Sequence, residues 1–403
     1  MSRLGHVGRE RLLLWLGICL VALNLRPLVS GLGPVLTQVR ADLHLSGALA
    51  GVITTLPVVC FGVFGSLAPP IAARVGIRRL TLVAMLAVAV GLVVRVVSGS
   101  GLVFVLGSTL ALAAIGFANV LIPTLVKLHF PRQIGLVTGV YTTLLQLSTA
   151  IAAAVSVPMS AALGGWREGL GVWALVAVVA AVPWLGLLRE RVALRPAVHR
   201  VTWRGLSHSP TAWLLAVFFG IQSANAYAQL GWLPALFTDA GVSKTGAGYA
   251  LAVIPAVGVV VSVVLAALTA RLRSFRPVVV TLCVCYAVGY LGVLVVPATV
   301  PWLWSLLLGV GGGTFPVSLM LIGLRARTGQ GSSALSGFVQ GIGYLVAAAV
   351  PFLIGVLHDA TRSWTAAVAV LLGSVALLFL AGLGVTRVRY VEDEIGTDRP
   401  EAA

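Results

Sequence analysis

One arginine lies inside a long apolar stretch near the N-terminus, where a cation is rarely found. Arg26 follows Leu23-Asn24-Leu25 and precedes Pro27, in an apolar run that begins at Leu12. About 14 helical residues at 1.5 Å each place it roughly 21 Å into a hydrocarbon core of ~30 Å. A guanidinium there costs about 3 kcal/mol or more unless it meets water or a partner. Because it can hold a planar anion through two hydrogen bonds, we predict that Arg26 binds an anionic substrate. The alternative is an arginine that braces helices through backbone carbonyls.

Groups that would support other chemistry are missing from the sequence. All eleven acidic residues fall at or beyond the ends of the apolar runs, whereas proton-driven exporters and cation transporters usually need a carboxylate within the membrane. Nucleotide-binding loops and catalytic triads are absent, and the four cysteines lack metal-ligand spacing. The sequence therefore predicts no enzyme, no catalytic residue, no metal and no cofactor. Proton coupling would have to use the substrate itself, a histidine or an edge acid such as Asp42.

Uncharged polar side chains recur on single faces of several apolar runs. Gln222, Asn225 and Gln229, for example, are spaced at i, i+3 and i+7. Since lipid cannot satisfy such groups, they should face the interior of a helix bundle. Each alone could equally well join two helices, but together they predict a polar central cavity. With Arg26, we predict these substrate-binding residues: Asn24, Asn119, Tyr141, Gln146, Gln222, Asn225 and Gln340.

Arg95 is the second candidate cation, but it lies close to a break in the apolar pattern. Only two residues separate it from Ser98-Gly99-Ser100-Gly101. A long arginine side chain so near the end of a span can extend to the interface. We therefore predict that Arg95 reaches the outer membrane surface.

The elements that must position these residues are membrane-spanning helices. Hydrophobic residues make up 59% of the chain, charged residues 9%, and the mean hydropathy is +1.05, which excludes an ordinary soluble domain. The net charge of +16 comes from short basic clusters between apolar runs, so it does not predict a nucleic-acid partner. Runs long enough to span a membrane lie at 12–36, 46–72, 79–98, 102–126, 134–162, 167–188, 210–237, 246–270, 277–296, 300–324, 332–357 and 363–386.

Charge placement predicts the orientation of these twelve spans. With the N-terminus inside, 21 basic residues fall in inner segments and 5 at outer ends, as the positive-inside rule requires. We predict a monomer in the bacterial cytoplasmic membrane with both termini cytoplasmic. The longest polar loop divides the chain into six-helix halves 1–188 and 210–386, joined by a linker at 189–209 and followed by a cytoplasmic tail at 387–403. Paired halves of this kind are typical of the all-α major facilitator fold, with substrate bound near the midplane.

Two sets of motifs strengthen this interpretation. Gly65-Ser66-Leu67-Ala68 and the following loop residues resemble the major facilitator signature between spans two and three, although Ala73 replaces its usual acid. The resemblance implies a gating role for Arg74, Gly76, Arg78 and Arg79, while the missing acid puts the usual charge relay of this loop in doubt.

Over essentially its whole length, the chain also resembles the cyanate porter family, which includes cyanate and 2-nitroimidazole transporters. The matching stretches are Leu23-Asn24-Leu25-Arg26-Pro27-Leu28, Gly33-Pro34, Ala212-Trp213, Phe219-Gly220, Gly231-Trp232-Leu233-Pro234-Ala235, Gly311-Gly312-Gly313-Thr314-Phe315-Pro316 and Gln340-Gly341-Ile342-Gly343-Tyr344. The resemblance implies a secondary transporter for a small anionic or planar polar solute, such as cyanate. Two alternatives remain open: an efflux transporter for neutral drugs such as nitroimidazoles, and a receptor or channel without alternating access.

Overall fold

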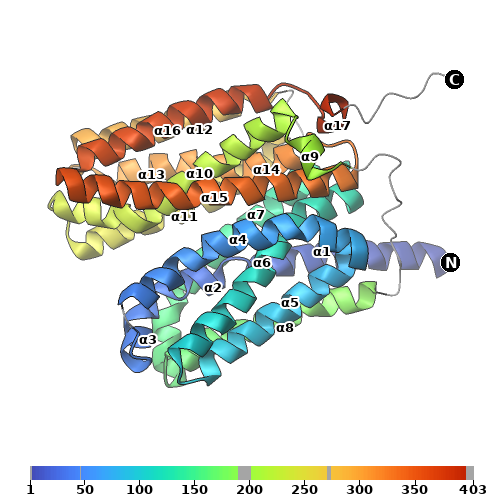
Figure 1. Ribbon diagram of the computed structural model, residues 1–403, viewed down its shortest axis with the longest axis horizontal. Helices are drawn as coiled ribbons and strands as arrows, with labels where there is room; N and C mark the ends of the chain where they lie inside the picture. Colours follow the sequence, from blue (N-terminus) through green and yellow to red (C-terminus); the bar gives the residue numbers. More distant parts are fainter. Residues whose placement is uncertain (1, 46, 189–200, 270–273, 396–403) are drawn as a thin grey trace. The chain divides into compact units, whose positions relative to one another are not determined.

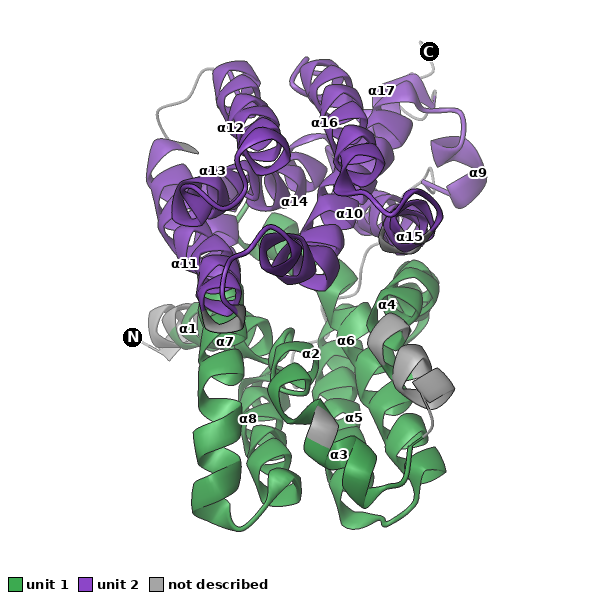
Figure 2. Ribbon diagram, turned by 90° about the vertical axis from the view of Figure 1, so that its left-hand side faces the viewer, with its two compact units in different colours: residues 1–132, 144–198 green, residues 133–143, 199–403 purple. Residues whose placement is uncertain are grey.

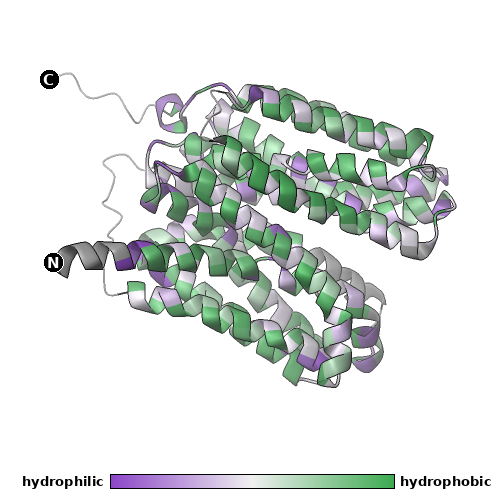
Figure 3. Ribbon diagram, turned by 180° about the vertical axis from the view of Figure 1, so that it is seen from behind, coloured by the Kyte–Doolittle hydropathy of each residue, from purple (hydrophilic) through white to green (hydrophobic). Residues whose placement is uncertain are grey.

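The structure is a computed structural model that describes residues 2–45, 47–188, 201–269 and 274–395. Every regular element in these ranges is a helix (Figure 1). Eleven stretches are long and apolar enough to cross a membrane. The first of them, Arg9–Val35, joins most of one long helix to two short ones. These apolar runs form helices because a helix pairs its backbone polar groups within the segment, which lipid requires. Hydrophilic residues lie mainly toward the helix ends (Figure 3).

The remaining predicted span, 210–237, corresponds to helix α10 (Pro210–Asp239), which has 30 residues. It is long enough to cross a membrane but is not among the eleven apolar stretches. Its middle carries the buried polar side chains of Gln222, Ser223, Asn225 and Gln229. A helix can hold so many polar groups in a bilayer only if they face protein or water, and here they are buried.

The chain forms two compact units (Figure 2). Unit 1 comprises Met1–Arg132 and Leu144–Val198, and unit 2 comprises Gln133–Thr143 and His199–Ala403. Helix α7 (Ile134–Leu163) therefore contributes to both units. Residues 189–200 of the predicted linker and residues 396–403 of the predicted tail lie outside the described residues.

Unit 1 is a bundle whose first span is interrupted. Besides its part of α7, the unit contains α1 (Ser2–Asn24), α2 (Pro27–Ser30), the 3-10 helix η1 (Gly33–Val35), α3 (Leu36–Asp42), α4 (Gly47–Val75), α5 (Ile77–Val97), α6 (Gly101–His129) and α8 (Trp166–Leu187). Helix α6 packs against α4 and α5, and α8 packs against α1 and α5. Helices α5 and α6 approach through Gly91 and Gly107, because a Cβ on Gly91 would lie 2.6 Å from the Gly107 carbonyl oxygen. Small residues permit such close contact between membrane helices.

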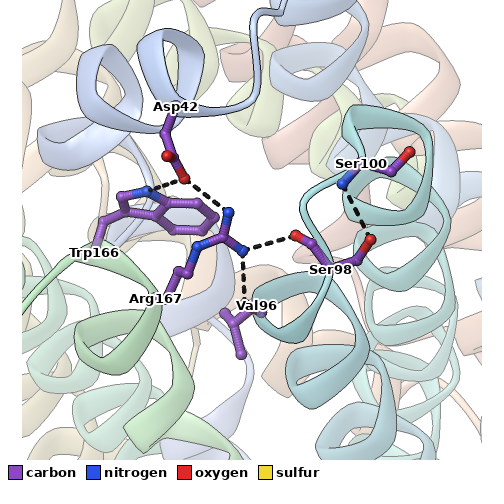
Figure 4. Close-up of polar contacts among 6 residues, drawn as sticks. All are labelled: Asp42, Val96, Ser98, Ser100, Trp166 and Arg167. Atoms are coloured by element: carbon purple, nitrogen blue, oxygen red, sulfur yellow. Dashed lines mark hydrogen bonds and ion pairs between the residues drawn. The ribbon is translucent and has the colours of Figure 1, made fainter.

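A polar network closes one end of unit 1 (Figure 4). Arg167, at the start of α8, donates from Nη1 to the carbonyls of Val96 (2.9 Å) and Ser98 (2.7 Å) at the end of α5. Its Nη2 lies 2.7 Å from a carboxylate oxygen of Asp42 in α3, which also accepts from Trp166 Nε1 at 3.2 Å. The network thus ties three elements together and satisfies carbonyls that α5 cannot pair internally.

Substitutions in this network should separate the capping bonds from the ion pair. Arg167→Gln is expected to destabilise the protein by about 1–2 kcal/mol, because two helix-terminal carbonyls lose a charged donor. Asp42→Asn should cost at most about 1 kcal/mol, because the Asp42 side chain is half exposed. Thermal unfolding in detergent measures both effects, with exposed Arg40→Gln as the control. An Arg167→Gln midpoint equal to that of Arg40→Gln would contradict the capping role.

Unit 2 is built around α10, which packs along α15 and α16, while α13 lies against α11 and α12. The elements are α9 (Trp203–Leu206), α10, α11 (Lys244–Thr269), α12 (Arg276–Val295), α13 (Pro301–Gly311), α14 (Thr314–Leu324), α15 (Gly329–Thr361), α16 (Trp364–Val385) and α17 (Val391–Glu394). The first turns of α7 join this unit, with Gly139 facing Ala266 of α11. Where α14 ends, Arg325 donates to the carbonyls of Val385 and Thr386 (3.0 and 3.1 Å), and burial lowers its pKa.

Candidate functional site

The first span breaks at the arginine singled out by the sequence. Helix α1 ends at Asn24, a turn follows at Leu25 and Arg26, and α2 begins at Pro27. Proline lacks a backbone N–H and disfavours helical geometry in the residue before it. Arg26 accordingly has φ −122° and ψ −29°. Its carbonyl oxygen accepts from the backbone nitrogens of Val29 (2.9 Å) and Ser30 (3.0 Å). The break therefore holds Arg26 at a fixed position inside an apolar span.

An aromatic ring accompanies the Arg26 guanidinium. The side chain is half-buried, and its Cζ lies 5.7 Å from the ring centroid of Phe61 in α4. Phe61 is fully buried, so the ring is held firmly in place. A cation over an aromatic face gains about 0.5–2 kcal/mol. Phe61 did not stand out in the sequence, because one phenylalanine in an apolar run has no distinguishing pattern.

The other predicted ligands in unit 1 lie on three helices. Asn24 is buried at the end of α1, where its Nδ2 donates to the carbonyls of Leu20 (2.8 Å) and Val176 (3.3 Å). It thereby holds the broken end of α1 against α8. Asn119 is buried in α6, and Gln146 is half-buried in α7. A role for these three in substrate binding remains a prediction.

The predicted ligands in unit 2 include a hydrogen-bonded network. Asn225 Nδ2 donates to the Ile221 carbonyl and to Ser374 Oγ of α16, both at 2.9 Å. Its Oδ1 accepts from Tyr290 Oη of α12 at 2.8 Å, and that hydroxyl accepts from Gln229 Nε2 at 2.9 Å. Both polar ends of Asn225 are thus engaged in joining three helices.

The other members of the unit 2 set are buried and lie on three different helices. Gln222 of α10 donates to Ser223 Oγ at 2.7 Å, and Gln340 of α15 donates to Ser336 Oγ at 2.8 Å. Tyr141 lies in the part of α7 that belongs to this unit, and only 2% of its surface is exposed. A substrate-binding role for these residues and for Asn225 remains a prediction.

The four loop-motif residues lie where α4 ends and α5 begins, and they occupy different environments. Arg74 and Arg79 are exposed, Gly76 has φ +91°, and Arg78 is buried. Arg78 forms an ion pair with Glu10 of α1 through Nη2, and the same nitrogen lies 3.2 Å from His129 Nε2. Glu10 thus supplies a carboxylate to this arginine, although Ala73 replaces the usual acid. Sequence spacing does not indicate this partner, since Glu10 lies 68 residues away along the chain.

The backbone at Gly76 provides a sharp test of this loop. Gly76→Ala is expected to destabilise the protein by about 1 kcal/mol or more, because an L-residue is strained at positive φ. Gly99→Ala is the matched control, since neither glycine has atoms within 4 Å of an added Cβ and only Gly76 has a positive φ. Equal thermal unfolding midpoints for the two variants would contradict this explanation.

Arg95 lies in a different place from the one that the sequence predicted. Its side chain is fully buried rather than extended to the outer surface, so that prediction was wrong. Its Nη1 lies 3.5 Å from the Leu28 carbonyl of α2, and its Cζ lies 5.7 Å from the centroid of the Phe104 ring. Phe104 belongs to an apolar cluster with Leu32 and Trp166. The folding of the α2–α3 segment over the end of α5 encloses Arg95, and linear spacing cannot reveal that.

Comparison with known proteins identifies the family. Residues 14–348 match the model of the Major Facilitator Superfamily. This chain belongs to the major facilitator superfamily. The 2-nitroimidazole transporter of Escherichia coli (strain K12) is 32% identical over 361 residues, which cover 89% of this chain and 91% of that protein. The cyanate transport protein CynX of the same organism is 29% identical over 350 residues, with coverages of 86% and 90%.

Solved structures agree with the family assignment. The proton:xylose symporter XylE superimposes with a TM-score of 0.72 at 13% identity, covering 98% of this chain and 99% of that chain. The fucose:proton symporter FucP of E. coli also gives a TM-score of 0.72, covering 96% and 100%. At this identity the likeness concerns the fold alone. The predicted all-α major facilitator fold is confirmed, and the protein is a multi-pass membrane transporter rather than an enzyme.

Proposed function

We propose that this transporter moves a small anionic or planar polar solute, such as cyanate, across the bacterial cytoplasmic membrane by alternating access. Both termini are proposed to be cytoplasmic, and the working unit a monomer. Arg26 binds the negative or electron-rich group of the solute. The observation that carries this proposal is a half-buried guanidinium at a helix break, inside an apolar span and beside the Phe61 ring.

The chemistry at this break suits a flat solute with electronegative ends. A guanidinium is planar and offers paired N–H groups to such a partner. The Phe61 ring provides an apolar face close to the same charge. Cyanate and the nitro group of a nitroimidazole share this chemistry, and relatives of this chain are named for transporting each of them. A common recognition element at Arg26 would account for both.

Proton coupling through Asp42 would disturb the polar network of unit 1. Asp42, an acid at the edge of a span, binds Arg167 and Trp166, so using it for proton coupling would break a network that holds three elements. Coupling through the substrate itself avoids that cost. Uniport and exchange are compatible with the same site.

Export of a neutral nitroimidazole is the second candidate, favoured by the 32% identity to the 2-nitroimidazole transporter. Reconstituted vesicles should be assayed for net flux of labelled cyanate and of 2-nitroimidazole in both directions. The proposal predicts saturable cyanate flux that protein-free vesicles lack. Movement of 2-nitroimidazole without any cyanate flux would overturn it in favour of the drug exporter.

A further inference from the structure

One edge of the buried Arg95 guanidinium has no partner in the described part of the chain. Its Nη1 has the Leu28 carbonyl at 3.5 Å, which is a long hydrogen bond. Its Nε and Nη2 are buried and have no hydrogen-bond partner among the described residues. These two nitrogens form one side of the planar group and point in nearly parallel directions. That side is therefore a preformed fork for two acceptor atoms.

The same edge is occupied on other arginines of this protein. Arg327 uses Nε and Nη2 to hold both carboxylate oxygens of Asp393, at 3.0 Å each. Arg325 uses the same two nitrogens to hold two carbonyl oxygens at the end of α16. Arg95 is more enclosed than either, with none of its surface exposed. A bidentate acceptor is thus the partner that its free edge fits.

No acid in the described part of the chain forms an ion pair with Arg95. Asp42, which lies in the neighbouring α3 helix, is bound to Arg167 and Trp166. A buried cation without a counter-charge is strongly unfavourable, because it has lost its hydration. An anion bound at the free edge would neutralise the buried charge. Because the Phe104 ring and its apolar cluster pack closely around Arg95, this anion has to be small.

The position of Arg95 connects it to the break at Arg26. Among the described residues, its hydrogen bond goes to Leu28 in α2, the single-turn helix that begins directly after Arg26. The segment Arg26–Ser30 therefore carries one guanidinium, that of Arg26, and contacts the other, that of Arg95, through a hydrogen bond. Movement of α2 during an alternating-access cycle would alter the surroundings of both groups together.

We propose that Arg95 is a second anion-binding residue, which holds a small monovalent anion with two acceptor atoms through Nε and Nη2. This inference rests on the proposed function, because it places a second anion-binding site next to the segment that carries Arg26. The anion is either the transported solute at a second stage of its passage or a resident inorganic anion. Both sources share the chemistry of a small, flat monovalent anion with two acceptor atoms, and a binding experiment can distinguish them.

Equilibrium dialysis of the purified full chain with labelled formate tests the site without requiring transport. Arg26→Gln should retain saturable formate binding. The double variant with Arg95→Gln should lose it, with affinity falling by at least about tenfold. Arg40→Gln, an exposed arginine in α3, should bind as the parent does. Equal binding by Arg26→Gln and the double variant would overturn the inference.

A second variant keeps the test decisive if Arg95→Gln does not fold. Arg95→Lys retains the charge but loses the fork. In an Arg26→Gln background it should abolish the preference for formate over chloride, and an unchanged preference would contradict bidentate binding. Displacement of formate by cyanate at transport concentrations identifies the solute as the occupant, whereas displacement by nitrate but not by cyanate identifies a resident anion. Displacement by chloride as readily as by nitrate would contradict bidentate binding. If Arg26→Gln leaves transport intact, the proposed function fails while Arg95-dependent binding is still measured independently.

Discussion

Arg26→Gln is expected to lower cyanate transport by about 100-fold while leaving the protein folded in the membrane. A hydrogen-bonded charged partner contributes about 1.5–3 kcal/mol, and 2.7 kcal/mol corresponds to roughly 100-fold in affinity. Glutamine keeps a polar side chain at the α1–α2 break but removes the charge and the planar fork. The loss should appear mainly as weaker solute binding. Initial uptake rates over a range of cyanate concentrations, corrected for surface expression, measure it.

Two companion variants make the result specific for the guanidinium. Arg26→Lys should recover part of the activity, because the charge is retained without the bidentate geometry. Arg40→Gln should transport as the parent does, since this arginine is exposed in α3. Parental transport by Arg26→Gln at equal expression would show that this residue only braces the helix break.

Glu392→Gln is expected to destabilise unit 2 by about 2–3 kcal/mol. Glu392 is buried, with only 3% of its surface exposed. Its carboxylate accepts from the backbone nitrogens of Arg327 (3.0 Å) and Thr328 (3.1 Å) and from Thr328 Oγ1. Thr328 caps the N-terminus of α15, so the negative charge also meets the positive end of the helix dipole. A neutral amide weakens these bonds and places a donor against other donors.

The neighbouring carboxylate of α17 provides the control. Asp393→Asn breaks an ion pair with Arg327 in which both side chains are nearly half exposed, and such pairs contribute about 0–1 kcal/mol. The thermal unfolding midpoint should therefore fall clearly for Glu392→Gln and little for Asp393→Asn. Similar midpoints for the two variants would contradict the capping explanation.

The sequence predicts the helical architecture well because lipid leaves few alternatives. Long apolar runs become helices wherever backbone groups must pair internally, and Pro27 predicts the break that separates α1 from α2. Even the polar span 210–237 becomes α10, although its buried amides lower its hydropathy. These features depend on local chemistry, which linear spacing records.

The surroundings of individual side chains depend instead on contacts between distant helices. Arg95 was predicted at a membrane surface from its distance to a span end, yet the α2–α3 segment encloses it. Likewise, Glu10 meets Arg78 and Phe61 meets Arg26 only when segments that are distant in the sequence come together in the fold. Polar spacing on one face correctly predicts burial of Asn225, but it cannot distinguish a solute ligand from a bond to Tyr290.

Counterflow in reconstituted vesicles tests the central claim most directly. Vesicles loaded with unlabelled cyanate are diluted into a trace of labelled cyanate, and the internal label is followed with time. A carrier with a saturable site should concentrate the label transiently above its equilibrium level, and Arg26→Gln should abolish this overshoot. A label that rises only to equilibrium, as through a channel, or an overshoot that persists in Arg26→Gln, would contradict the account.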